Sequence, residues 1–389
     1  MMAHTTKRQF RFVTHDRRYG LFAIMTAILV SACSSDSSQG LNQDSTGDAD
    51  FQEETWDDIS EDALRADAQD SADALGCIEE VVPLDETWSL SAPGVSLVIT
   101  GNPYSISVLN HQGEAVLNSF MAGEGDGYGP IAESVGAVGW SNMVSDGYYR
   151  LSTDFDAWHE SWAVTEAAEN ETGVSLVLVS LDSEEPCSRR SISVAHTVGP
   201  SLVRVEASIL SGDLPRMWST AFDSGDEEAF LGFGERFNRT DQRGVDVYSW
   251  AEEGGIGTGE GDLISDSNPT PNGEAMTYYP VPFFISTGGY GFWLDSTWYN
   301  MFNLVTDYED AWRVWHIGPS LAFEIYTPFP DDERQWPYHL IDKFTERTGR
   351  PMVPPAWTFG PRRRINENDE QEGVSEIQAM RDLDLAITA

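Results

Sequence analysis

The 389-residue sequence has few cysteines, few basic residues and no apolar run long enough to cross a bilayer. It contains 3 Cys, and its 23 Lys+Arg face 64 Asp+Glu, which gives a formal net charge of −41 at pH 7. Such a charge repels nucleic acid and anionic membrane surfaces, so neutral or cationic ligands fit better. The acidic stretch Gly259–Asp266 lacks the spacing of a helix-loop-helix calcium site. We therefore expect no nucleic-acid partner, no metal and no cofactor.

The N-terminal residues have the pattern of an export signal. Basic residues precede the uncharged run Leu21–Val30, which at about 10 residues matches a signal-peptide core. The run continues into Ser31, Ala32 and Cys33, which resembles a bacterial lipobox, where cleavage precedes a lipid-bearing cysteine. We expect residues 1–32 to be a lipoprotein signal peptide and Cys33 to anchor an exported protein to a bacterial membrane, with the outer membrane favoured by Ser34. The alternative is an ordinary buried cysteine.

An acidic, polar stretch follows at residues 33–76. Residues 34–75 carry thirteen acids against Arg65 alone and few large apolar side chains, so we expect a disordered linker. With Cys33 lipidated, Cys77 and Cys187 remain as an even pair in an oxidising compartment, which favours a disulfide over two free thiols.

Residues 77–335 have the texture of a β-protein. Short runs of alternating β-branched or aromatic residues are separated by Gly, Asn, Asp and Pro, and no repeat of 20 to 50 residues is visible. The fold class that this predicts is mostly β, an antiparallel β-sandwich. Its clearest expected strands are Ser96–Thr100, Tyr104–Leu109, Val174–Ser180, Ser191–Ala195, Leu202–Ala207 and Leu321–Tyr326.

The last 54 residues change pattern again. Helical spacing over Tyr338–Arg347 predicts a connecting helix within residues 336–350, which Gly349 and Pro351 end. Within residues 351–389 we expect a strand at 356–360, a helix through Val374–Leu383 and a second strand at 385–389. This β/α order is that of the start of a (β/α)8 TIM barrel, truncated inside its second strand.

Several motifs carry a resemblance to a known family. They are Gly232–Phe237, Asp241–Gly244, Tyr248–Trp250, Tyr279–Thr287, Tyr290–Asp295 and the junction Leu340–Trp357. In this order the motifs resemble the N-terminal part of glycoside hydrolase family 31, which includes α-glucosidases, α-xylosidases and sulfoquinovosidases. The resemblance implies a galactose-mutarotase-like sandwich ahead of a catalytic barrel, and the stretch from Asp241 to Gly257 is most similar to the sulfoquinovosidase branch.

The resemblance also implies a reaction. Members of the family are retaining, exo-acting α-glycosidases that use two Asp residues on later barrel strands, one as nucleophile and one as acid and base. Neither position falls within these 389 residues, so we expect no catalytic residue here and no activity from this chain alone. The expected partner is an α-linked sugar bound by the whole enzyme.

Two groups of residues are candidates for substrate binding. Glu252 and Glu253 lie in the Gly- and acid-rich stretch 251–277, which in the family leans over the barrel mouth; the alternative is a pair of solvated carboxylates. Arg362, Arg363 and Arg364 follow the expected first barrel strand, where guanidinium groups pair with anionic sugars or with acidic neighbours.

Other residues are expected to be structural, and other functions stay open. Glu235 and Arg236 should be ion-paired or hydrogen-bonded, and the aromatic group Trp293, Trp298, Tyr299 and Phe302 should belong to the core rather than stack on sugars. A lipid-anchored, non-catalytic carbohydrate-binding or scaffold protein is the main alternative. A mutarotase-like epimerase would need a His and Glu pair, and the histidines have no spacing that indicates one: His111, His159, His196, His316 and His339.

Overall fold

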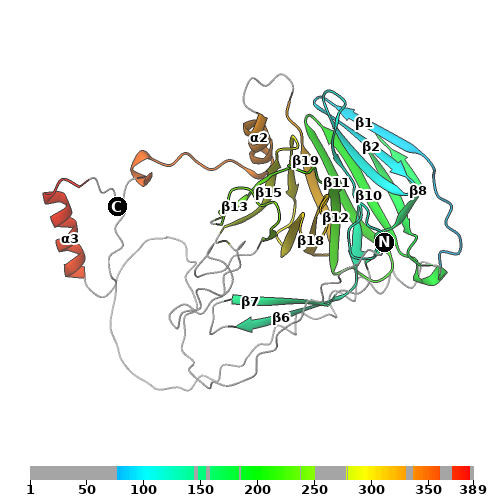
Figure 1. Cartoon of the computed structure of the whole chain (residues 1–389), viewed down its shortest axis with the longest axis horizontal. Coiled ribbons are helices and arrows are strands. Elements are labelled where there is room, and N and C mark those ends of the chain that lie inside the picture. Colours follow the sequence, from blue (N-terminus) through cyan, green and yellow to red (C-terminus); the bar gives the residue numbers. More distant parts are fainter. Residues whose placement is uncertain are drawn as a thin grey trace, which may run out of the picture.

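The computed structural model describes residues 77–143, 148–154, 158–183, 185–236, 238–249, 277, 279–329, 336–359 and 370–385. These residues form antiparallel sheets that stack face to face (Figure 1). The architecture is mostly β, as expected, and consistent with a β-sandwich. No helix within these ranges combines the length and apolarity needed to span a bilayer.

The largest sheet has eight strands and forms one layer. Its order is β13 (Phe230–Gly234), β15 (Pro280–Ser286), β16 (Tyr290–Leu294), β19 (Ser320–Tyr326), β11 (Leu202–Ser211), β10 (Ser191–Gly199), β9 (Gly173–Ser180) and β8 (Trp162–Glu169). β8 and β13 are therefore its two edges, far apart across the sheet.

Two smaller sheets pack against it. The five-stranded sheet has the order β14 (Asp246–Tyr248), β17 (Asn300–Leu304), β18 (Ala311–Ile317), β12 (Met217–Asp223) and β5 (Ala132–Ser134). The four-stranded sheet runs β1 (Thr87–Ala92), β2 (Val95–Gly101), β3 (Tyr104–Asn110) and β4 (Ala115–Asn118). A separate hairpin pairs β6 (Ala137–Met143) with β7 (Tyr148–Asp154).

The core lies between these layers because alternate residues of each strand turn inward. β2 shows the pattern plainly, with every second residue buried from Val95 to Gly101. Inward side chains from the three larger sheets form one continuous apolar cluster, which includes Leu97, Leu176, Phe292 and Trp312. All six strands expected from alternation are confirmed as strands, namely β2, β3, β9, β10, β11 and β19.

The Cys77–Cys187 disulfide ties the first described residue to a short 3-10 turn, η2 (Pro186–Ser188), after β9. Backbone bonds support the same junction: Ile78 N donates to Pro186 O at 3.0 Å, and Arg189 Nη1 donates to Ile78 O at 2.8 Å. The pair is the one that cysteine counting favoured. It fastens the point where the acidic stretch 33–76, which lies outside the described residues, joins the sandwich.

Two helices follow the last strand. α2 (Trp336–Thr348) confirms the expected connecting helix, and α3 (Glu370–Asp382) confirms the helix expected through Val374. The strand expected at 356–360 is wrong: residues Ala356–Phe359 form a 3-10 turn, η3. Pro354 and Pro355 precede this turn, and the Pro355 carbonyl accepts hydrogen bonds from both N and Oγ1 of Thr358 at 3.0 and 2.7 Å. The strand expected at 385–389 lies almost wholly outside the described residues, and the barrel remains a prediction.

Candidate functional site

The residues predicted to bind substrate lie outside the described part of the chain. These are Glu252 and Glu253, together with Arg362, Arg363 and Arg364, and the lipidation candidate Cys33 does too. Their roles remain predictions. The structure does describe both places where the 250–276 segment joins the sandwich, and this base forms the candidate site.

A strained bulge in β13 builds one side of the base. Gly232, Phe233 and Gly234 all have positive φ, at 141°, 67° and 85°, and the pairing of β13 with β15 shifts register between the two glycines. Glycine adopts such values readily, whereas other residues rarely do, so the backbone strain lies at Phe233. The Phe233 ring holds the bulge in place because it is fully buried and stacks on Phe284 at 5.1 Å between centroids. Bulges of this kind redirect a strand and are frequent beside functional sites.

Close backbone contacts also leave no room for a side chain at either glycine. A Cβ at Gly232 would lie 2.7 Å from the Phe283 carbonyl oxygen, and one at Gly234 would lie 2.0 Å from that of Tyr279. The glycines of the motif Gly232–Phe237 thus have a physical meaning: they let the β13 backbone lie unusually close to the neighbouring chain at Tyr279–Phe284. Sequence reasoning identified the motif without predicting the bulge.

Hydrogen bonds hold the described residues that flank the 250–276 segment. Glu235 N donates to Tyr279 O at 3.0 Å, Thr277 Oγ1 donates to Glu235 O, and Tyr279 N donates to Thr277 Oγ1 at 3.0 Å. On the other side, Ser249 N donates to Asn300 O at 3.0 Å. The roles of Thr277 and Tyr279 were missed, because a single Thr between two loops carries no recognisable sequence signal.

Arg236 bridges two parts of this base. Its Nε donates to Phe233 O at 3.0 Å and its Nη2 donates to Tyr248 O at 2.8 Å, so the guanidinium joins the bulge to the strand that leads into the segment. Burial lowers the Arg236 pKa to about 10, which still leaves it protonated at neutral pH. The hydrogen-bonded role expected for Arg236 is confirmed, whereas the Glu235 side chain is exposed.

The aromatic group divides between core and surface. Phe302 is fully buried and Trp293 packs on the Phe344 ring of α2 at 5.8 Å, as a core role predicts. Trp298, however, is 56% exposed. Tyr279, at the end of the segment, is 70% exposed, so two large aromatic side chains face solvent beside the base.

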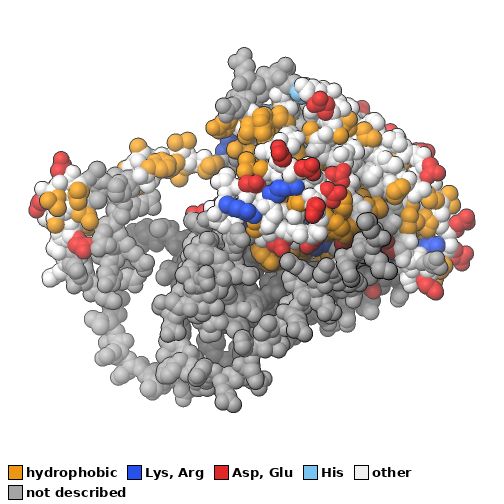
Figure 2. Space-filling model, in the orientation of Figure 1, with side chains coloured by type: hydrophobic (Ala, Val, Ile, Leu, Met, Phe, Trp, Pro, Cys, Tyr) orange, Lys and Arg blue, Asp and Glu red, His pale blue; other side chains and the backbone are white. Residues whose placement is uncertain are grey.

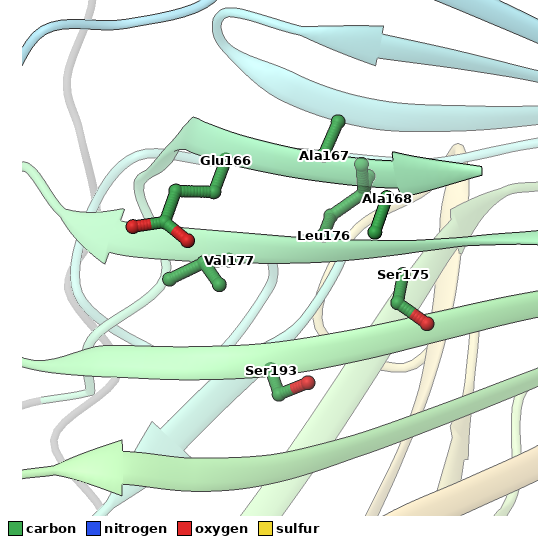
Figure 3. Close-up of a pocket in the computed structure, with 7 residues that line it drawn as sticks. All are labelled: Glu166, Ala167, Ala168, Ser175, Leu176, Val177 and Ser193. Carbon is green, nitrogen blue, oxygen red and sulfur yellow. The ribbon is translucent and has the colours of Figure 1, made fainter.

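A shallow pocket of about 150 Å³ lies elsewhere, on β8, β9 and β10 (Figure 3). The carboxylate of Glu166 and the hydroxyls of Ser175 and Ser193 are its polar groups, and no aromatic ring lines it. Since β8 is the edge opposite β13, this pocket is not part of the candidate site. Within the described ranges, no three His, Cys, Asp or Glu side chains come together as metal ligands would.

A solved enzyme structure has the same fold as this chain. The chain aligns with a family 31 sulfoquinovosidase from E. rectale with a TM-score of 0.54 and 15% identity, over 77% of this chain and 40% of that one. At this identity the match establishes the fold alone, a β-sandwich of the kind found in that enzyme.

Two curated proteins are similar to this chain in sequence. The chain is 29% identical over 157 residues to an isomaltosyltransferase from Sporosarcina globispora, and 29% identical over 137 residues to the α-xylosidase XylQ of Lactiplantibacillus pentosus. The matches span 40% and 35% of this chain but only 13% and 15% of those relatives, and no family model matches the chain. Together these relatives and the solved structure point to glycoside hydrolase family 31, over part of the chain.

Proposed function

We propose that this chain is the N-terminal portion of a retaining, exo-acting α-glycoside hydrolase. The observation that carries the proposal is the base just described, in which the β13 bulge and Arg236 hold both ends of a segment bearing Glu252 and Glu253. Bulges and strained backbone are over-represented beside functional sites. The similarity to an isomaltosyltransferase and an α-xylosidase supplies the substrate class, an α-linked sugar.

In the proposed enzyme, two carboxylates on a catalytic barrel outside this sequence perform the displacement. This chain contributes binding. Glu252 and Glu253 accept hydrogen bonds from sugar hydroxyls, and the exposed rings of Tyr279 and Trp298 offer apolar faces at the base. Arg362, Arg363 and Arg364 supply positive charge, which suits an anionic sugar.

The main alternative is a non-catalytic, lipid-anchored protein that binds carbohydrate or serves as a scaffold. The continuous core favours it, because the sandwich needs no further polypeptide to bury its apolar residues. The stretch beyond α2 argues against it: Met352, Val353 and Phe359 are 84%, 92% and 76% exposed, and Figure 2 shows apolar side chains gathered along this arm. Exposed apolar stretches of this kind mark surfaces that another polypeptide covers.

Activity assays separate the two functions. We would purify the 389-residue chain and a version extended through the downstream reading frame, and assay both on aryl α-glucoside, α-xyloside and α-sulfoquinovoside. Hydrolysis by the extended version only is the expected result, and the preferred substrate names the sugar. Hydrolysis by the short chain, or by neither protein while the short chain binds oligosaccharide, would reject the proposal.

The same proposal places the protein on a bacterial membrane through lipid on Cys33. Metabolic labelling with a radioactive fatty acid tests this, with Cys33→Ser as the control that should lose both the label and the membrane fraction. Fatty-acid label that persists in the variant would reject Cys33 as the lipidated residue.

A further inference from the structure

A row of polar side chains crosses the inner face of the five-stranded sheet. Register places Glu133 of β5 opposite Trp218 of β12, Trp218 opposite His316 of β18, and His316 opposite Asn300 of β17. Residues directly opposite in antiparallel strands point to the same face. An isolated bridge from His159 to Glu133 extends the row at one end.

The row also continues at its other end. Ser249 N donates to Asn300 O, directly after the Tyr248–Met301 pair of β14 and β17. Ser249 is the last described residue before the 250–276 segment. The row therefore leads from β5 across the sheet to the base of the candidate site.

Five members of this row each carry a buried polar atom without a hydrogen-bond partner in the described part of the chain. The atoms are His159 Nδ1, Trp218 Nε1, His316 Nε2, Asn300 Oδ1 and Ser249 Oγ. Trp218, His316 and Asn300 are 0%, 2% and 1% exposed. Buried polar atoms are nearly always hydrogen-bonded in proteins, since leaving one unpaired costs about 1–3 kcal/mol. Five such atoms on one row therefore indicate a shared partner.

The chemistry of the row identifies that partner. The indole N–H of Trp218 only donates, the Asn300 carbonyl oxygen only accepts, and the imidazole nitrogens and the Ser249 hydroxyl can do either. Opposite residues on adjacent strands have Cβ atoms about 4.5–5.5 Å apart, a spacing that one molecule making hydrogen bonds on both sides can bridge. Water is the smallest molecule that both donates and accepts.

We propose that a file of ordered water molecules lies along this row, from His159 to Ser249, and is an integral part of the sandwich. His159 Nδ1 lies 3.8 Å from Asp182 Oδ2, beyond hydrogen-bond distance, and two other polar groups of the row are bonded within the protein. Arg190 Nη2 donates to Glu133 Oε2 at 3.0 Å, and Ser296 Oγ pairs with His316 Nδ1 at 3.2 Å. The inference does not depend on the proposed catalytic function.

Nuclear magnetic resonance of the full chain tests the proposal directly. The indole proton of Trp218, assigned through a Trp218→Phe variant, should show cross-relaxation with water of the sign that marks a long-lived bound molecule. Trp162 is the matched control, because it is equally buried and its Nε1 donates to the Ile131 carbonyl at 2.8 Å. Its indole proton should show no such signal.

A crystal structure of the full chain gives the second readout. Water density should lie within about 3.5 Å of Trp218 Nε1, His316 Nε2 and Asn300 Oδ1. A dry row, with these atoms bonded directly to one another or to other protein groups, would overturn the proposal. So would an indole of Trp218 as isolated from water as that of Trp162.

Discussion

The Glu324 carboxylate of β19 accepts a hydrogen bond from Nε of Arg347 on α2 at 3.0 Å, and this bond links the connecting helix to the large sheet. The same oxygen accepts from Arg204 Nη1 at 2.8 Å, while Tyr326 OH donates to the other oxygen at 2.6 Å. Stacking of Phe283 on Phe344, with centroids 4.1 Å apart, fixes the helix on the same face. The direction in which the chain leaves the sandwich is therefore set by a charged and an aromatic contact together.

The buried carboxylate should matter far more than its partner on α2. Glu324 is 0% exposed, and Glu324→Ala removes the acceptor of Tyr326 OH and one of three carboxylates that Arg204 contacts, the others being Asp295 and Glu206. The variant should lower the free energy of unfolding by about 2 kcal/mol. The Arg347 side chain is 48% exposed, so Arg347→Ala should cost less than about 1 kcal/mol. Denaturant titration measures both. Equal losses would contradict the assigned burial, whereas faster hydrogen exchange in α2 of Arg347→Ala would support the link.

Strand positions could be predicted because the information is local. Alternation from Val95 to Gly101 shows directly which residues of β2 turn inward. The expected strand at 356–360 failed for a local reason as well: an apolar run after Pro354 and Pro355 has no neighbouring strand among the described residues, and Pro355 begins a 3-10 turn instead. A short apolar run alone does not reveal whether a partner strand exists.

The candidate site depended on contacts that no local pattern contains. The bulge at Phe233 requires the carbonyl groups of Phe283 and Tyr279, some fifty residues away, to lie under Gly232 and Gly234. The buried polar row arises from the register of strands that are distant in sequence, such as β5 and β12. The spacing of His316 and Asn300 in the sequence does not indicate that they lie opposite each other on neighbouring strands.

The bulge predicts a contrast between two glycines with similar positive φ values. Gly234 and Gly289 have φ values of 85° and 90°, but a Cβ at Gly289 would meet nothing within 4 Å. Gly289→Ala should therefore cost only the conformational strain, about 1 kcal/mol. Gly234→Ala adds a steric clash with the Tyr279 carbonyl and should cost about 3 kcal/mol. Thermal and denaturant unfolding of both variants gives the comparison, and similar losses would mean that the close contact is absent.

The disulfide predicts sensitivity to reducing agents. Cys77 and Cys187 are 110 residues apart in sequence, and in the chain-entropy account a loop of this size contributes roughly 4 to 5 kcal/mol. Replacing both by Ser should lower the free energy of unfolding accordingly and make it independent of dithiothreitol. Cys33→Ser is the matched control and should leave the response to reductant unchanged. If the double variant unfolds like the oxidised parent, the bond adds nothing to stability.

Two buried histidines predict loss of stability in mild acid. Burial lowers the pKa of His196 and of His316 to about 4, from an ordinary value of 6.5. Between pH 6.5 and pH 4 each ring binds a proton in the unfolded state but not in the folded state. The stabilisation from each neutral histidine is therefore fully present above pH 6.5, and the free energy of unfolding falls as the pH drops towards 4. The difference amounts to about 3 kcal/mol for each residue.

A variant isolates this histidine effect from other titrating groups. Desolvation raises the pKa of the carboxyls of Glu160 and Asp182, and this acts in the opposite direction, because these groups gain protons on folding as the pH falls. His196→Gln keeps a side chain able to bond Tyr104 OH, which lies 2.7 Å from His196 Nε2, but does not titrate. Denaturant unfolding at pH 7 and pH 4.5 should therefore show a smaller acid loss in the variant. An unchanged difference between the two pH values would mean that His196 takes up its proton without unfolding.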